Sequence, residues 1–136
     1  MPKYLLLKHY RGGPENVRDC PPLDEWPPEA FEAHIAFQGQ VNDMLRENGE
    51  WLDAQGLTPE RVYVRYGGPD AAPVVTDGPH PETADLIAGW FAIDVDSRER
   101  ALEVAAYASS EPAHDGRPML EWIEVRQMFD SIPEDE

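Results

Sequence analysis

The 136-residue sequence predicts a single α+β domain over residues 1–130, followed by a short acidic tail over residues 131–136. Two segments place apolar residues at helical spacing, and the segments around them alternate apolar and polar residues as strands do. Their order is strand, helix, strand, an inserted hairpin-like segment, strand, helix, strand. This is a βαββαβ pattern with one insertion. It predicts a ferredoxin-like fold, in which both helices cover one face of an antiparallel sheet.

The first half of the chain contains one strand and the longer helix. "KYLLLKHY", residues 3–10, predicts the first strand. Residues 11–28 are rich in proline and predict an irregular connection, because proline lacks a backbone donor and restricts the residue before it. A long helix is predicted over residues 29–48, where Asn48-Gly49 is a natural stop.

The second half of the chain contains the remaining strands and a second helix. The segments with strand patterns are 50–57, 61–67, 88–95 and 118–129. The second helix is predicted over residues 96–110. Asp96 is expected as its N-cap, because Glu99 follows three residues later in a capping-box-like arrangement.

Apolar residues lie on both faces of the predicted strands. In the first strand Leu5 and Leu7 share a face with His9, and the opposite face is also apolar. In the strand over 88–95, Trp90 and Ala92 alternate with further apolar residues in the same way. Two helices cover only one face of a sheet, so the second face requires another cover. We therefore expect a homodimer whose sheets face each other.

Charge and hydropathy exclude two classes of partner. The chain has 11 Lys and Arg against 27 Asp and Glu, a net charge of -16, so binding to nucleic acid or anionic lipid through a basic surface is disfavoured. No segment has the roughly 20 consecutive apolar residues that a membrane span requires. We expect a cytoplasmic protein with no nucleic-acid or membrane partner.

Motifs for metals and common cofactors are absent from the sequence. There is a single cysteine, and no histidine pair has the spacing of the HExxH zinc motif. The sequence also has no GxGxxG, GxxxxGK[ST] or GxSxG motif. We therefore expect neither a metal site nor a bound cofactor.

The predicted long helix has two polar residues, His34 and Gln38, inside its apolar arc. The apolar residues of this arc are Phe31, Ile35, Phe37, Val41, Met44 and Leu45. A buried polar group without a partner costs about 1 to 3 kcal/mol, so both side chains need hydrogen bonds. His34 is either a core histidine bonded to a backbone carbonyl or a cleft residue that acts as a general acid or base.

Further candidates lie at a strand end and around the segment "TDGPHPET". His9 ends the first strand, where sites tend to open, and His80 is held between two prolines. Asp77 begins a tight turn that Pro79 stiffens, which predicts either a rigid flap over the sheet edge or a purely structural turn.

The segments "TDGPHPET", "LIAGWFAIDVDSRERALEVAA" and "EWIEVR" resemble the YCII-related family, specifically its DGPF-domain branch. The resemblance extends from the first strand to about Arg126 and implies a dimeric α+β barrel. The sequence departs from the motif at two places: its phenylalanine is His80 here, and the usual Lys-Glu is Ala84-Asp85.

The resemblance also implies candidate chemistry. Members of this family have a histidine in the first helix that is proposed to be catalytic, and the family is similar to enzymes that isomerise or dehalogenate lactones. His34 matches that histidine approximately. The acidic partner expected near the end of the first strand is absent, and Asp77 is the remaining candidate. Some members of the DGPF branch resemble companions of extracytoplasmic-function sigma factors.

Two functional hypotheses follow. In the first, the dimer is an enzyme that acts on a small lactone- or carboxylate-like substrate, with His34 and Asp77 as catalytic residues. The residues expected to bind the substrate are His9, Gln38, Tyr63, Arg65 and His80. In the second, the protein is a non-catalytic ligand-binding or regulatory module, associated with a sigma factor.

Overall fold

The computed structural model describes residues 2–11, 14, 21, 23–58, 60–76 and 86–130. Its helices and strands are β1 (Lys3–Arg11), a short 3-10 helix (Leu23–Glu25), α1 (Pro28–Glu47), β2 (Trp51–Gly56), β3 (Tyr63–Arg65), β4 (Val74–Thr76), β5 (Leu86–Asp94), α2 (Arg98–Ser109) and β6 (Trp122–Gln127). The predicted α+β class is confirmed. Neither helix combines the length and the apolar character needed to span a membrane among these residues.

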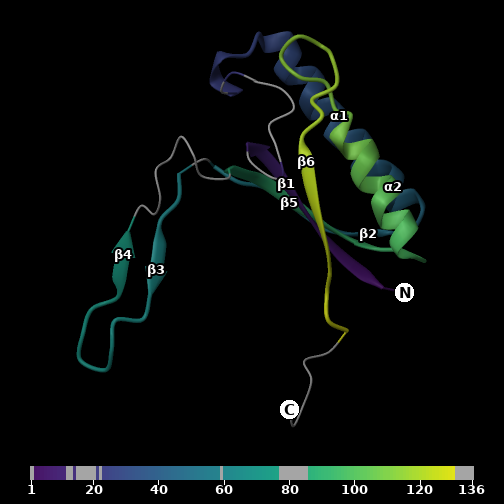
Figure 1. Cartoon of the computed structure of the whole chain (residues 1–136). Helices are drawn as coiled ribbons and strands as arrows, with labels where there is room; N and C mark the ends of the chain where they lie inside the picture. The colour runs from purple at the N-terminus through teal and green to yellow at the C-terminus, as the bar shows by residue number, and fades with distance from the viewer. Residues whose placement is uncertain are drawn as a thin grey trace.

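The main sheet has four strands in the order β2-β5-β1-β6, and every neighbouring pair is antiparallel. The hairpin-like insertion predicted between the second and third strands of this sheet is present as β3 and β4. These two strands pair with each other in a separate two-stranded sheet. Figure 1 shows this hairpin projecting away from the main sheet.

Both helices lie on one side of the main sheet, where the main hydrophobic core forms (Figure 1). Alternate side chains of the two central strands point into this core. The buried core residues are Tyr4, Leu6, Val41, Leu45, Phe91, Ile93, Val95, Ala101, Val104, Ala105 and Ala108. We call this side of the sheet the helix face and the other side the open face.

The buried stripe of α1 is narrower than the apolar arc predicted from the sequence. Phe31 and Ile35 are exposed, at 40% and 48%, whereas His34 is buried together with Val41 and Leu45. His34 lies at the centre of the stripe that faces the sheet, and Ile35 is rotated from it by about 100°. The expectation that Phe31 and Ile35 are core residues is therefore wrong.

Helix α2 begins one residue later than an Asp96 N-cap requires. The N-cap is Ser97, whose side chain accepts a hydrogen bond of 3.2 Å from the backbone N–H of Arg100. Ser97 has the extended backbone that an N-cap adopts, with φ at -157° and ψ at 164°. The predicted cap at Asp96 is thus wrong by one position, because a serine hydroxyl satisfies the free N–H at least as well as a carboxylate.

The open face of the main sheet is partly apolar. Leu5 and Leu7 of β1 and Trp90 of β5 are half-buried, and Ala92 is buried. Trp122 of β6 is 38% exposed. The prediction that both faces of the strands carry apolar side chains is consistent with this pattern, but no helix covers the open face in the described part of the chain.

We expect Ser97→Ala to lower the free energy of unfolding by about 1 kcal/mol, because one N–H of the first turn of α2 loses its partner. Asp96→Ala is the matched control and should change stability by less than about 0.5 kcal/mol. Urea unfolding followed by circular dichroism measures both. A larger loss for Asp96→Ala than for Ser97→Ala would contradict the observed cap.

Candidate functional site

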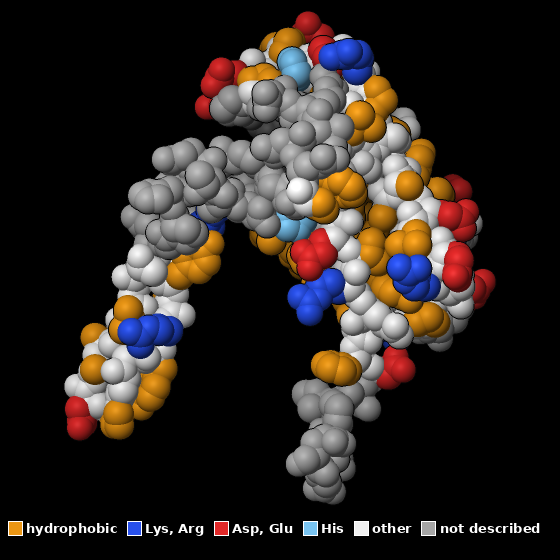
Figure 2. All heavy atoms as spheres, in the orientation of Figure 1, with side chains coloured by type: hydrophobic (Ala, Val, Ile, Leu, Met, Phe, Trp, Pro, Cys, Tyr) orange, Lys and Arg blue, Asp and Glu red, His pale blue; other side chains and the backbone are white. Residues whose placement is uncertain are grey.

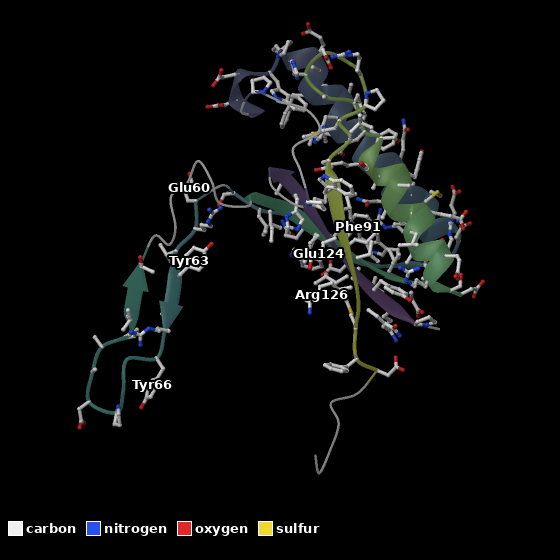
Figure 3. The ribbon with its side chains drawn as sticks, in the orientation of Figure 1. Glu60, Tyr63, Tyr66, Phe91, Glu124 and Arg126 are labelled. Carbon is white, nitrogen blue, oxygen red and sulfur yellow. The ribbon has the colours of Figure 1, made fainter. Side chains whose placement is uncertain are left out.

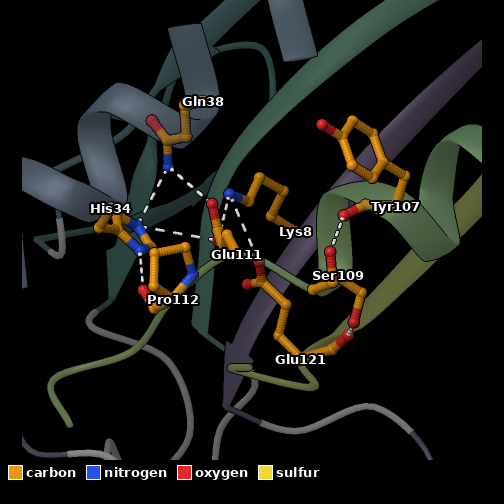
Figure 4. A network of polar contacts seen from close by, with 9 residues as sticks. Lys8, His34, Gln38, Tyr107, Ser109, Glu111, Pro112 and Glu121 are labelled. Atoms are coloured by element: carbon orange, nitrogen blue, oxygen red, sulfur yellow. Dashed lines mark hydrogen bonds and ion pairs between the residues drawn. The ribbon is translucent and has the colours of Figure 1, made fainter. Parts of the chain in front are cut away.

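A network of polar side chains is buried between α1, β1 and the loop that follows α2 (Figure 4). Lys8 comes from β1, and His34 and Gln38 lie one turn apart on α1. Glu111 and Glu121 stand at the two ends of the loop between α2 and β6. The exposed fractions of Lys8, His34, Glu111 and Glu121 are 9%, 1%, 1% and 8%. Polar groups buried to this extent must satisfy one another.

The loop over residues 111–121 folds back on itself and thereby brings its two glutamates together. The backbone N–H of Met119 donates to the carbonyl of Glu111 at 2.8 Å, and the Ser109 hydroxyl donates to the carbonyl of Glu121 at 2.6 Å. Leu120 has a φ of 58°, a left-handed conformation that is rare for a residue with a side chain. The backbone thus reverses immediately before Glu121, and both carboxyl groups reach Lys8.

Lys8 joins the two carboxyl groups. Its Nζ lies 2.7 Å from Oε1 of Glu111 and 3.4 Å from Oε1 of Glu121. Gln38 supports the same carboxylate from the other side, because its Nε2 donates to Oε2 of Glu111 at 3.3 Å. Both oxygens of Glu111 are therefore held by donors. Neither carboxyl oxygen of Glu121 accepts a hydrogen bond of good geometry among the described residues.

The hydrogen bonds of His34 define its tautomer. Nδ1 lies 3.0 Å from the carbonyl oxygen of Pro112, which can only accept, so Nδ1 carries the proton. In the neutral ring Nε2 is then an acceptor, and the Nε2 of Gln38 donates to it at 3.1 Å. The ring of Trp26 packs edge-on against the imidazole, with centroids 5.1 Å apart. His34 is therefore enclosed by groups that satisfy both of its nitrogens.

The two glutamates have pKa values shifted in opposite directions. Burial raises the pKa of Glu121 well above its ordinary 4.5, and its hydrogen bond to Glu111 raises it further. Burial also acts to raise the pKa of Glu111, but the hydrogen bond from Glu121 and the charge of Lys8 outweigh it and lower that pKa. Burial alone would lower the pKa of Lys8, and the two carboxyl groups raise it instead.

These directions favour an ion pair between Lys8 and Glu111 and the protonated form of Glu121 beside it. A buried ion pair avoids the high cost of an uncompensated buried charge. Carboxyl groups with divergent pKa values are also the arrangement that acid–base enzymes use. No group of three or more His, Cys, Asp or Glu suited to a metal ion occurs in the described part of the chain.

A second polar cluster lies on the open face of the sheet, on strands β1 and β6. The Nε2 of His9 is 3.0 Å from Oε1 of Glu124, and Arg126 lies 4.0 Å from the other oxygen of Glu124. Figure 3 shows Glu124 and Arg126 on β6. The side chain of His9 is 8% exposed, whereas those of Glu124 and Arg126 are 43% and 70% exposed. We call these three residues the open-face row.

The structure distributes the predicted site residues over three places. His34 and Gln38 contact each other on the helix face, and His9 lies on the open face. Tyr63 and Arg65 are exposed on β3, away from both clusters. Asp77 and His80 lie outside the described residues.

Sequence reasoning did not identify Lys8, Glu111, Glu121 or Glu124. For Lys8 a signal existed, because it follows Tyr4 and Leu6 at alternate positions and so falls on a buried stripe of β1. The glutamates had no such signal. Glu111 and Glu121 lie in a loop without periodicity, and Glu124 is one acidic residue among many in a chain of net charge -16.

Comparison with protein-family models finds no match for this sequence, and comparison with curated proteins finds none either.

We expect Glu121→Gln to remove a pH dependence of stability. In the wild type the folded state keeps the Glu121 proton above the ordinary pKa of 4.5, whereas the unfolded chain releases it. This contribution is fully present below pH 4.5 and is lost as pH rises through the folded pKa, at up to about 1.4 kcal/mol per pH unit.

Urea unfolding at several pH values above 4.5 measures the effect of Glu121→Gln. The gain in stability of the variant relative to wild type should grow with pH. Glu103→Gln, an exposed change on α2, is the matched control and should run parallel to wild type. Parallel curves for Glu121→Gln and wild type would show that Glu121 is already ionised in the folded protein.

Proposed function

We propose that this chain belongs to the DGPF-domain branch of the YCII-related family and forms a ferredoxin-like homodimer that binds a small carboxylate-bearing molecule between its sheets. The sheet order β2-β5-β1-β6, with two helices on one face, supports this fold type, because it is the order expected when a βαββαβ chain folds antiparallel. The quoted DGP segment supports the family assignment.

The open face supports the homodimer. Leu5, Leu7 and Trp90 form an apolar strip across its two central strands, and Trp122 extends the strip onto β6. A sheet face of this kind resembles half of a core, and a second copy placed face to face completes it. Charged residues at its margin, such as Asp53 of β2, would remain near solvent.

The single observation that carries the ligand proposal is the open-face row beside this apolar strip. Binding sites for small molecules combine an apolar wall with a few polar groups that converge. Here Arg126 has an exposed guanidinium whose nearest acidic partner, Glu124, is 4.0 Å away. A guanidinium of this kind binds a carboxylate through two parallel hydrogen bonds.

Within this site each member of the row has a distinct role. Arg126 binds the anionic group of the ligand. The imidazole of His9 gives or takes a proton, the role that histidine most often has in acid–base catalysis. Glu124 orients the imidazole through the 3.0 Å contact to Nε2. In this proposal the acid–base residue of the enzyme hypothesis is therefore His9 and not His34.

His34 has a structural role in this proposal. Its ring is 1% exposed, and both of its nitrogens are engaged by Pro112 and Gln38. A substrate would have to displace these contacts before it reached the ring. His34 and Gln38 therefore position Glu111 and the loop after α2.

The same observation favours a second candidate, a non-catalytic binding or regulatory module. If the enclosed network holds the helix face rigid and the open face only binds a ligand or a partner protein, no proton transfer is required. Turnover separates the two candidates. Binding of a small carboxylate without any chemical change over many hours would favour the module.

We expect the protein to be a dimer that buries more than about 1,000 Å² in total. Multi-angle light scattering at micromolar concentration measures the mass. Each chain carries a charge of -16, and salt screens the repulsion over about 10 Å at 0.1 M, so dimerisation should weaken at low ionic strength. A monomeric mass at both ionic strengths would refute the dimer.

We expect Arg126→Gln to weaken the binding of small carboxylates by about tenfold or more, because a charge-assisted hydrogen-bond pair is lost. Ligand-observed NMR with a fixed panel of hydroxy acids, keto acids and lactones measures this affinity. His9→Gln should leave binding within a few-fold and abolish any turnover.

His34→Gln is the matched control for these variants. It should lower the free energy of unfolding by about 1 to 3 kcal/mol through the lost bond to Pro112, without changing the affinity of the bound panel members. Loss of ligand binding in His34→Gln with an unchanged melting temperature would show that the ligand binds on the helix face instead.

A further inference from the structure

The β3–β4 hairpin, which we call the arm and define as residues 60–76, exposes apolar side chains along its length. All six residues of its two strands are exposed. The arm projects from the main sheet, and Figure 2 shows hydrophobic side chains on it and a wide notch between it and the rest of the molecule. Among the described elements, the two strands of the arm mainly contact each other.

One face of the arm carries three valines and a tyrosine. The register pairs Val64 with Val75, so these two side chains share a face. Strand alternation places Val62 and Tyr66 on the same side. The exposed fractions of Val62, Val64, Tyr66 and Val75 are 60%, 60%, 76% and 60%. The opposite face is mixed, with Tyr63 and Arg65 on β3.

The tip of the arm is built as a defined turn. A side chain at Gly67 would come within 2.2 Å of the carbonyl oxygen of Ala72, and Gly68 has a φ of 118°, which favours glycine. The two glycines allow the chain to close tightly between β3 and β4. The hairpin is therefore a specified element, although a two-stranded hairpin alone is only marginally stable in water. Its apolar face needs a surface to cover it.

The charge of the arm indicates which molecule covers its apolar face. Whole chains at -16 repel each other, but the arm has two arginines against two acidic residues and so no formal net charge. The arm can therefore approach another copy of this chain without the repulsion that the remaining surface imposes. The β6 margin of the open face of a second copy offers the matching surface, because Trp122 there is 38% exposed, whereas the opposing sheet of the proposed dimer covers the central strip of Leu5, Leu7 and Trp90.

We propose that in the homodimer each arm packs its apolar face on the β6 margin of the other protomer's open face and places the Tyr66 hydroxyl beside the open-face row there. This inference rests on the dimer proposed above and adds a residue to its ligand site. A phenolic hydroxyl can both donate to a ligand carboxylate and accept from the Arg126 guanidinium. Each ligand site is then composed of groups from both copies, and a monomer lacks a complete one.

The double variant Val64→Thr/Val75→Thr tests the packing, because threonine keeps the β-branched shape that favours a strand and replaces one methyl group by a hydroxyl. Four substituted side chains per dimer should raise the dimer dissociation constant by about tenfold or more, measured by sedimentation equilibrium. Leu102→Thr is the matched control. Leu102 is 39% exposed on α2, on the helix side, and its replacement should leave the constant unchanged.

A benzophenone amino acid at position 66 tests where the arm lies. Dimers mixed from ¹⁵N-labelled and unlabelled protein should give crosslinks that join differently labelled chains and end within residues 3–11 or 122–127. Crosslinks confined to single chains, or an unchanged dissociation constant in the double valine variant, would overturn the arm inference and leave the face-to-face dimer standing. A wild-type monomer would overturn the dimer and with it the arm.

Discussion

The buried ion pair between Lys8 and Glu111 is the interaction on which the rest of the structure depends. Its 2.7 Å contact joins the centre of the sheet to the loop after α2, across 103 residues of sequence. A cation and a carboxylate buried together are tolerated only when their remaining polar atoms also have partners. Gln38 donates to Glu111, and Glu121 contacts Lys8. Removal of either partner would leave a buried charge, so the network holds strand, helix and loop in one arrangement.

This buried network gives the two faces of the sheet different roles. On the helix face Lys8, Glu111, Gln38 and His34 contact one another in an enclosed network. On the open face the buried ring of His9 pairs with the exposed carboxylate of Glu124, and the Arg126 guanidinium is exposed beside apolar strands. The alternation of side chains along β1 points Lys8 to the helix face and the adjacent His9 to the open face, so one strand serves both faces.

The negative net charge of the chain limits which of its surfaces can contact a second copy. A charge of -16 on 136 residues discourages contact between identical surfaces except where charge is sparse. The apolar strip of the open face and the uncharged face of the arm are such places. Both lie apart from the acidic outer surfaces of the helices, where Glu99 and Glu103 are exposed. The two surfaces best suited to a second copy are thus two that no helix of the described part of the chain covers.

The sequence by itself determined the element order, the inserted hairpin and the alternation of β1, because these depend on periodicities among near neighbours in the chain. It also marked His34 and Gln38 as polar residues in an apolar stripe. Only the tertiary structure decided what they contact. Glu111 and Glu121 meet Lys8 because a loop reverses at Leu120 and packs against a strand more than 100 residues away, and no local pattern encodes that encounter. Similarly, Phe31 and Ile35 are exposed because the sheet faces His34. The apolar arc of α1 is too broad to determine which of its residues face the sheet.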